Sequence, residues 1–248
     1  NKITDEGIRR LIQLHTLNAS FNEKITDEGI RCLIQLHTLN ASHNKKITNK
    51  GIKHLQLKIL NASDNSGITD EGIRHLMQLY KLNASFNEKI TDMGIRYLMQ
   101  LHTLDASYNE KITDEGIKHL QLHKLDISYN TKITDEGIKH MQLHTLDISH
   151  NTKITDEGIK HQGTNVPIAK LHTLNASRNN NITDEGIKHL QLHTLDASWN
   201  NNITDEGIKH LQLHTLDASW NNNITDEGIK HMQLHALYAS YNKKITDE

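Results

Sequence analysis

The chain has 248 residues, and its 28 lysines and arginines against 30 aspartates and glutamates give a formal net charge of −2. This balance excludes a strongly basic nucleic-acid-binding protein and a polybasic membrane anchor. Hydrophobic residues make up 35% of the chain and aromatic residues only 4%, so we expect a core built almost entirely from Leu and Ile. The single cysteine, Cys32, excludes an internal disulfide framework and a thiolate zinc site. It also favours a cytoplasmic protein, with a secreted protein as the alternative.

A segment of the form Ile-Thr-Asp-Glu-Gly-Ile recurs along the whole chain. Its first Ile returns every 21 or 22 residues, with one longer interval of 28 residues between Ile154 and Ile182. A fixed period of this size predicts a solenoid. We therefore expect a single array over residues 1–248, with ten full repeats of 21–28 residues and partial repeats at both ends.

The predicted elements are taken in chain order within one repeat, Leu101 to Gln121, whose residues define positions 1–21. Alternating apolar residues at positions 4 and 6 predict a short strand with one inward face. Thr at position 13, followed by Asp and Glu, predicts the N-cap and first turn of a short helix. Gly at position 16 removes a side chain, so that successive helices can pack closely. Apolar residues at positions 17 and 20 form the inner face of that helix.

An Asn at position 9 marks the turn after each predicted strand in every repeat. We expect its buried amide to satisfy backbone groups of its own turn and of the next one. These asparagines are Asn22, Asn44, Asn65, Asn87, Asn109, Asn130, Asn151, Asn179, Asn200, Asn221 and Asn242.

The strand half, Leu101-x-x-Leu104-x-Ala106-x-x-Asn109, resembles the leucine-rich repeat L-x-x-L-x-L-x-x-N/C, with Ala where Leu is usual. The segment from Ile112 to Ile117 is similar to the cysteine-containing subclass found in F-box adaptor proteins, although Asn replaces the Cys. The resemblance implies an α/β solenoid, a leucine-rich repeat horseshoe with a parallel β-sheet on the concave face and short helices on the convex face.

The repeats differ at position 8, which we expect on the concave face together with position 5. Seven of the ten aromatic residues lie at position 8, and position 5 is mostly Asp or Asn. Because Trp and Tyr supply large contact areas at low entropic cost, we expect a binding surface for a protein or peptide. Stacking of the rings merely on one another is the alternative. The candidate binding residues are Phe21, Phe86, Tyr108, Tyr129, Arg178, Trp199, Trp220 and Tyr241 at position 8, with Asp105, Asp126, Asp147, Asp196 and Asp217 at position 5.

Nineteen histidines recur mainly at positions 2 and 19. No repeat combines His with Cys or with paired carboxylates at ligand spacing, so we expect no metal site and no cofactor. We interpret the histidines as inherited repeat decoration. The longer interval contains an insertion near residues 162–168, which we expect in a loop on the helical side. A duplication scar is favoured there over a partner site.

No unique catalytic constellation is present, so we expect no enzyme. The leading hypothesis is a protein-interaction module that binds a protein or peptide on its concave face. By resemblance, its most concrete version is a substrate-recognition arm of an F-box type ubiquitin ligase. A secreted or surface adhesin or effector repeat is the alternative among binding proteins, and a structural or surface-binding array is the alternative class. We expect no nucleic-acid or membrane partner.

Overall fold

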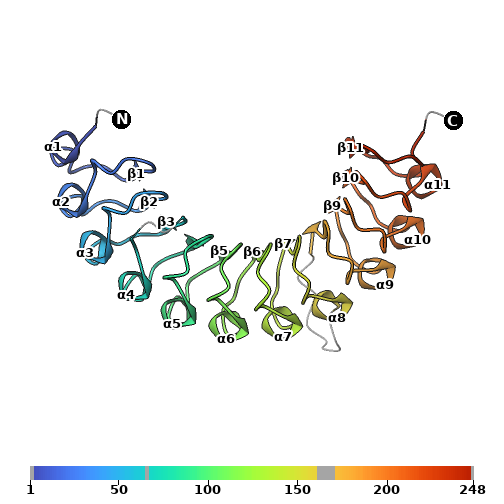
Figure 1. Cartoon of the computed structure of the whole chain (residues 1–248), viewed down its shortest axis with the longest axis horizontal. Helices are drawn as coiled ribbons and strands as arrows, with labels where there is room; N and C mark the ends of the chain where they lie inside the picture. The colour runs from blue at the N-terminus through green and yellow to red at the C-terminus, as the bar shows by residue number, and fades with distance from the viewer. Residues whose placement is uncertain (1–2, 65–66, 161–170, 247–248) are drawn as a thin grey trace. The chain divides into compact units, whose positions relative to one another are not determined.

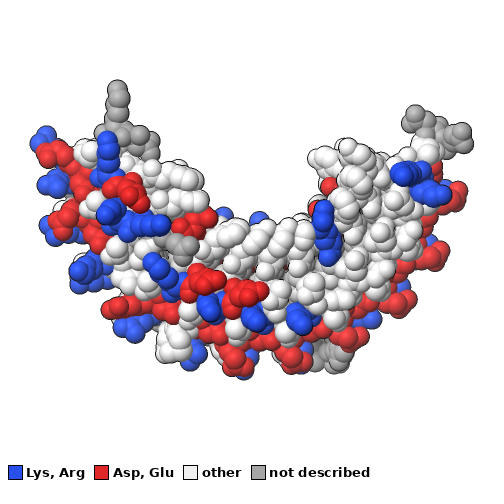
Figure 2. Space-filling view, in the orientation of Figure 1, with Lys and Arg blue, Asp and Glu red and all other residues white. Residues whose placement is uncertain are grey.

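The computed structural model describes residues 3–64, 67–160 and 171–246. The chain forms two compact units, residues 1–122 and 123–248, and each is described by itself. In both units three-residue strands alternate with helices of four residues. Within each unit the strands lie side by side on one side, and the helices lie on the opposite side (Figure 1). Figure 2 shows most charged side chains on the helical side.

The first unit contains five strands and six helices among its described residues. The strands are β1 (Thr16–Asn18), β2 (Thr38–Asn40), β3 (Ile59–Asn61), β4 (Lys81–Asn83) and β5 (Thr103–Asp105). The helices are α1 (Asp5–Ile8), α2 (Asp27–Ile30), α3 (Asn49–Ile52), α4 (Asp70–Ile73), α5 (Asp92–Ile95) and α6 (Asp114–Ile117).

The second unit contains six strands and five helices among its described residues. The strands are β6 (Lys124–Asp126), β7 (Thr145–Asp147), β8 (Thr173–Asn175), β9 (Thr194–Asp196), β10 (Thr215–Asp217) and β11 (Ala236–Tyr238). The helices are α7 (Asp135–Ile138), α8 (Asp156–Ile159), α9 (Asp184–Ile187), α10 (Asp205–Ile208) and α11 (Asp226–Ile229).

In each unit the strands pair in parallel, and equivalent positions of successive repeats lie opposite one another. Leu17 pairs with Leu39 in the first unit, and Leu195 pairs with Leu216 in the second. The predicted parallel sheet with helices on the other side is therefore confirmed within each unit. Each helix is a single turn that ends at position 17, so the apolar residue at position 20, such as Leu120, is buried just after the helix rather than on it.

The Ile-Thr-Asp-Glu-Gly-Ile segment links each helix to the preceding one. Thr26 Oγ1 accepts a hydrogen bond from Glu28 N at 3.2 Å, which confirms the predicted N-cap. Its own N–H and hydroxyl donate to the two carboxylate oxygens of Asp5 in the preceding repeat, each at 2.7 Å. A Cβ on Gly29 would lie 2.9 Å from Asp5 Cγ, so Gly leaves the space that this carboxylate occupies. The close packing predicted for position 16 is confirmed.

The position-9 asparagines form a buried amide ladder. Asn109 Nδ2 donates to the carbonyl oxygens of Ala84, Asn87 and Ile90 at 3.1, 2.8 and 3.1 Å, while its Oδ1 accepts from Lys111 N at 2.9 Å. The predicted structural role is confirmed, but the carbonyls belong to the preceding turn and not to the next one. The reason is geometric, since the side chain points back along the array while its oxygen serves its own turn. Asn65 and the insertion near residues 162–168 lie outside the described residues.

Candidate functional site

Position 8, where most candidate binding residues lie, is the third residue of a tight turn that follows each strand. In the second unit Asn200 N donates to Ala197 O at 3.2 Å, which closes this turn around Ser198 and Trp199. All eleven position-8 residues have a positive φ of 53° to 59°. Such a φ favours Gly or Asn at this turn position and costs other residues about 1–2 kcal/mol. Backbone preference therefore does not explain the bulky rings.

The second unit holds a continuous stack at position 8 over three adjacent turns. The rings of Trp199 and Trp220 lie 4.4 Å apart, and those of Trp220 and Tyr241 lie 4.1 Å apart. The Arg178 guanidinium covers the other face of Trp199, 4.0 Å from the ring centroid. We call these four residues the Trp stack. Each stacked pair contributes about 0.5–1.5 kcal/mol, which is comparable to the cost of the positive φ. Both tryptophans remain 38% exposed.

The other position-8 residues form shorter stacks. Tyr129 stacks on His150 at 3.9 Å in the second unit. In the first unit Phe21 stacks on His43 at 4.0 Å, and Phe86 stacks on Tyr108 at 4.1 Å. Asp64, which pairs with His43 at 3.0 Å, stands between these two stacks. Ring stacking, the alternative to a binding surface, is thus present, yet large ring areas stay exposed along the strand side.

The position-5 aspartates lie half-buried at the ends of the strands, beside the turns that carry position 8. Asp105 Oδ1 accepts from Ser107 N at 3.1 Å and from its hydroxyl at 2.7 Å. The same bond from Ser198 N reaches Asp196 Oδ1 at 2.9 Å, and Asp126, Asp147 and Asp217 make the equivalent bond. Sequence reasoning missed this turn-forming role, although an Asp or Asn two residues before an invariant Ser is a signal for it.

Burial and neighbouring charge shift three ionisable groups along the strand side. Burial, followed by repulsion from Asp147, raises the pKa of Asp126. Burial also raises the pKa of Asp196, and repulsion from Asp217 adds to that shift. Burial and the Arg178 guanidinium lower the pKa of His150. The ionised carboxylates of Asp126 and Asp196 are therefore destabilised in the second unit. An added hydrogen-bond donor or cation on the strand side would stabilise them.

The position-2 histidines, interpreted from the sequence as repeat decoration, form a second ladder where the strands begin. The rings of His172, His193, His214 and His235 stack with centroid distances of 5.0 to 5.2 Å. Two further rings, His123 and His144, continue this ladder at 5.2 and 5.7 Å. Thus the strand side of the second unit lies between an imidazole ladder and the position-8 residues.

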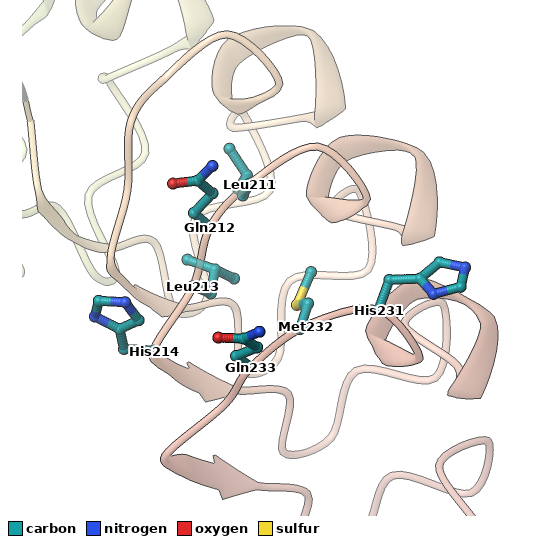
Figure 3. Close-up of a pocket in the computed structure, with 7 residues that line it drawn as sticks. All are labelled: Leu211, Gln212, Leu213, His214, His231, Met232 and Gln233. Atoms are coloured by element: carbon teal, nitrogen blue, oxygen red, sulfur yellow. The ribbon is translucent and has the colours of Figure 1, made fainter.

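A cavity of about 370 Å³ lies between the loop that leads from α10 to β10 and the loop that leads from α11 to β11. Figure 3 shows its His214 and His231 side chains pointing away from each other. Its lining residues are Leu211, Gln212, Leu213, His214, His231, Met232 and Gln233. Within the described ranges, no three His, Cys, Asp or Glu side chains are grouped to hold a metal ion. None of the described helices has the length and apolar character needed to cross a membrane.

Comparisons with solved structures show similarity to several repeat proteins. The chain matches yeast Rad7, crystallised in complex with Elc1, with a TM-score of 0.72 and 18% identity over 100% of this chain and 75% of that one. An internalin from Listeria monocytogenes matches with a TM-score of 0.51 and 18% identity over 94% and 93% of the two chains. A chain from the crystal structure of the mouse RP105/MD-1 complex matches with a TM-score of 0.60 and 18% identity over 98% of this chain and 45% of that one. At this identity the matches establish the fold alone.

No curated protein sequence matches the chain. The leucine-rich repeat family matches seven segments that together cover more than half of it, namely residues 13–33, 97–120, 121–141, 139–160, 169–190, 192–211 and 213–232. Repeats of this family are typical of protein-binding scaffolds, and the comparisons indicate no catalytic family. The chain therefore belongs to the leucine-rich repeat family.

Proposed function

We propose that the chain is a protein-interaction module and that the strand side of its second unit binds an extended segment of a protein partner. The observation that carries the proposal is the Trp stack, which keeps three aromatic residues and Arg178 at turn positions where Gly or Asn fits the backbone better. Residues held in unfavourable backbone conformations concentrate at functional sites. Exposed Trp, Tyr and Arg are also the side chains that dominate binding energy at protein interfaces.

The half-buried carboxylates beside the Trp stack favour a partner segment that carries N–H donors or cationic side chains. Asp196 and Asp217 repel each other. A hydrogen-bond donor placed between them offsets both the cost of burying the Asp196 charge and this repulsion. Arg178 on Trp199 demonstrates that a guanidinium fits against a ring of this stack. A partner with Lys or Arg next to an apolar side chain therefore matches the surface.

The experiment is a selection of displayed peptides on the immobilised chain, followed by titration of each selected peptide. Trp199→Asn/Trp220→Asn removes both rings but suits the positive φ, so the turns persist. We expect this variant to bind at least about tenfold more weakly. The matched control, Phe21→Asn, makes the same change at position 8 of the first unit and leaves affinity unchanged. Equal binding by the double variant and the unchanged chain overturns the proposal.

A more specific version of this function is the substrate-recognition arm of an F-box type ubiquitin ligase in the cytoplasm. Its support is the Ile-Thr-Asp-Glu-Gly-Ile segment, similar to that of the cysteine-containing subclass, together with the similarity to Rad7, which was crystallised with Elc1. Deleting the gene for this chain should then lengthen the half-life of the partner protein in cells. An unchanged half-life contradicts the ligase role while leaving partner binding intact.

A further inference from the structure

The helical side of the first unit departs from the repeat pattern at α5. Position 15 is Glu or Lys in every other repeat, but it is Met93 in α5. Position 19, which is most often His, is Tyr97 in the same repeat. Directly after position 20 the repeats of α4 and α5 carry Met77 and Met99, where the repeats of α1 and α2 carry Ile12 and Ile34. We call Met77, Met93, Tyr97 and Met99 the α5 patch.

The α5 patch is exposed and lies away from the strand side. Its four side chains are 47% to 56% exposed. Met93 lies in α5, Tyr97 lies in the turn directly after it, and Met77 and Met99 occupy equivalent positions in adjacent repeats. In Figure 2 uncharged surface interrupts the band of charged side chains near α5. Three of the chain's five methionines thus gather on a surface that is charged elsewhere.

The charges around the α5 patch are unbalanced in the positive direction. In the repeats of α2 and of α6 to α11 the residues at positions 15 and 18 form ion pairs, as Glu115 and Lys118 do at 2.6 Å. In α5 Met93 occupies the position of the glutamate that pairs with position 18 in those repeats. Arg96 Nε donates instead to Asp92 O at 3.3 Å. At positions 15 and 18 the turns of α3 to α6 carry five cations and two carboxylates, namely Lys50, Lys53, Arg74, Arg96 and Lys118 against Glu71 and Glu115. The same positions of α9 to α11 carry three of each.

We infer that the α5 patch docks an acidic protein segment that carries large apolar side chains. Flexible Met side chains adapt to apolar anchors of different shape, and an exposed apolar patch with a charged rim is typical of a protein-binding surface. The local excess of Lys and Arg selects for Asp and Glu around those anchors. A continuous anionic membrane fits less well, because it would face Glu71 and Glu115 together with the cations. A peptide can instead place uncharged residues against these two carboxylates.

The test uses a fluorescein-labelled synthetic peptide with Leu and Phe at helical i, i+4 and i+7 spacing and Glu at most other positions. Met93→Glu/Tyr97→His restores the residues that other repeats carry, so this variant keeps the fold. We expect the whole chain to bind the acidic peptide and the variant to bind it at least about tenfold more weakly. A peptide with Lys in place of Glu, and one with Ser in place of Leu and Phe, should both fail to bind.

The control variant Trp199→Asn/Trp220→Asn should bind the acidic peptide normally, so failure of this inference is separable from failure of the proposed function. Equal binding by Met93→Glu/Tyr97→His, or equal binding of the Lys peptide, overturns the inference. The inference is also overturned if the chain binds vesicles of phosphatidylserine and phosphatidylcholine and Met93→Glu/Tyr97→His abolishes that binding. The patch would then bind a membrane. Self-association that depends on the same two residues would overturn the inference as well.

Discussion

The positive φ of Trp220 leads to an unusual order of stability among substitutions at this residue. Trp220→Gly and Trp220→Ala both remove the stacking contacts with Trp199 at 4.4 Å and Tyr241 at 4.1 Å. Only Gly adopts the φ of 59° without steric cost. The two variants therefore lose the same side-chain contacts and differ mainly in the backbone.

The magnitude follows from this geometry. Losing two ring stacks costs either variant about 1–3 kcal/mol beyond the buried area. Ala keeps a backbone penalty of about 1–2 kcal/mol that Gly avoids. Gly loses about 0.5–1 kcal/mol more conformational entropy on folding than Ala. We therefore expect Trp220→Gly to be more stable than Trp220→Ala by about 0.5–1 kcal/mol, the reverse of the order in regular strands.

Urea unfolding followed by circular dichroism measures the difference between the two variants. Thr215→Gly and Thr215→Ala in the neighbouring strand β10 are the control pair, because Thr215 has no positive φ and Ala should be the more stable there. If Trp220→Ala proves as stable as Trp220→Gly, the positive φ is not a real constraint at this turn. The proposed function would then lose the observation on which it depends.

Three further predictions concern stability. Asn200→Ala removes the side-chain amide that donates to the carbonyls of Ala176, Asn179 and Ile182. We expect the free energy of unfolding in urea to fall by about 3–5 kcal/mol, and a fall below about 1 kcal/mol would contradict the ladder. Gly207→Ala places a methyl group 2.9 Å from Asp184 Cγ and should speed hydrogen exchange of the Thr204 N–H that Asp184 accepts, so unchanged exchange would count against this account. Asp196→Asn keeps the acceptor for Ser198 and should stabilise the fold at neutral pH. Because the pKa of Asp196 is raised in the folded state, the chain with Asp196 gains stability as the pH falls through that pKa towards 3.8. The stability advantage of Asp196→Asn should therefore shrink over this pH range. An advantage that is constant with pH would contradict the pKa shift.

Much of the fold follows from the sequence because each repeat position has one dominant physical role. The sequence alone predicts the 21- or 22-residue period, the buried Leu and Ile positions, the Thr N-cap and the close packing at Gly. The direction of the Asn ladder was not, since an amide can equally serve the turn before or the turn after it. The exact helix length was also missed, because Leu120 lies three residues after Ile117 whether or not the helix continues.

The candidate site was predictable in its residues but not in its backbone. The aromatic enrichment at position 8 is visible in the sequence, whereas its positive φ is hidden because no repeat has Gly there. Position 5 is recognisable as a surface residue, yet its bond to Ser198 depends on a turn that the strand pattern does not specify. The imidazole ladder arises from register, which brings single residues such as His193 and His214 together only after folding.

The most direct test of the central claim is the pair of indole N–H signals in the ¹H–¹⁵N spectrum of the chain. Trp199 and Trp220 are its only two tryptophans, and both belong to the Trp stack. Titration with a selected peptide that binds the chain should shift both signals, with dissociation constants equal to the one measured for binding. If the peptide binds while both indole signals stay unchanged, the Trp stack is not the binding surface.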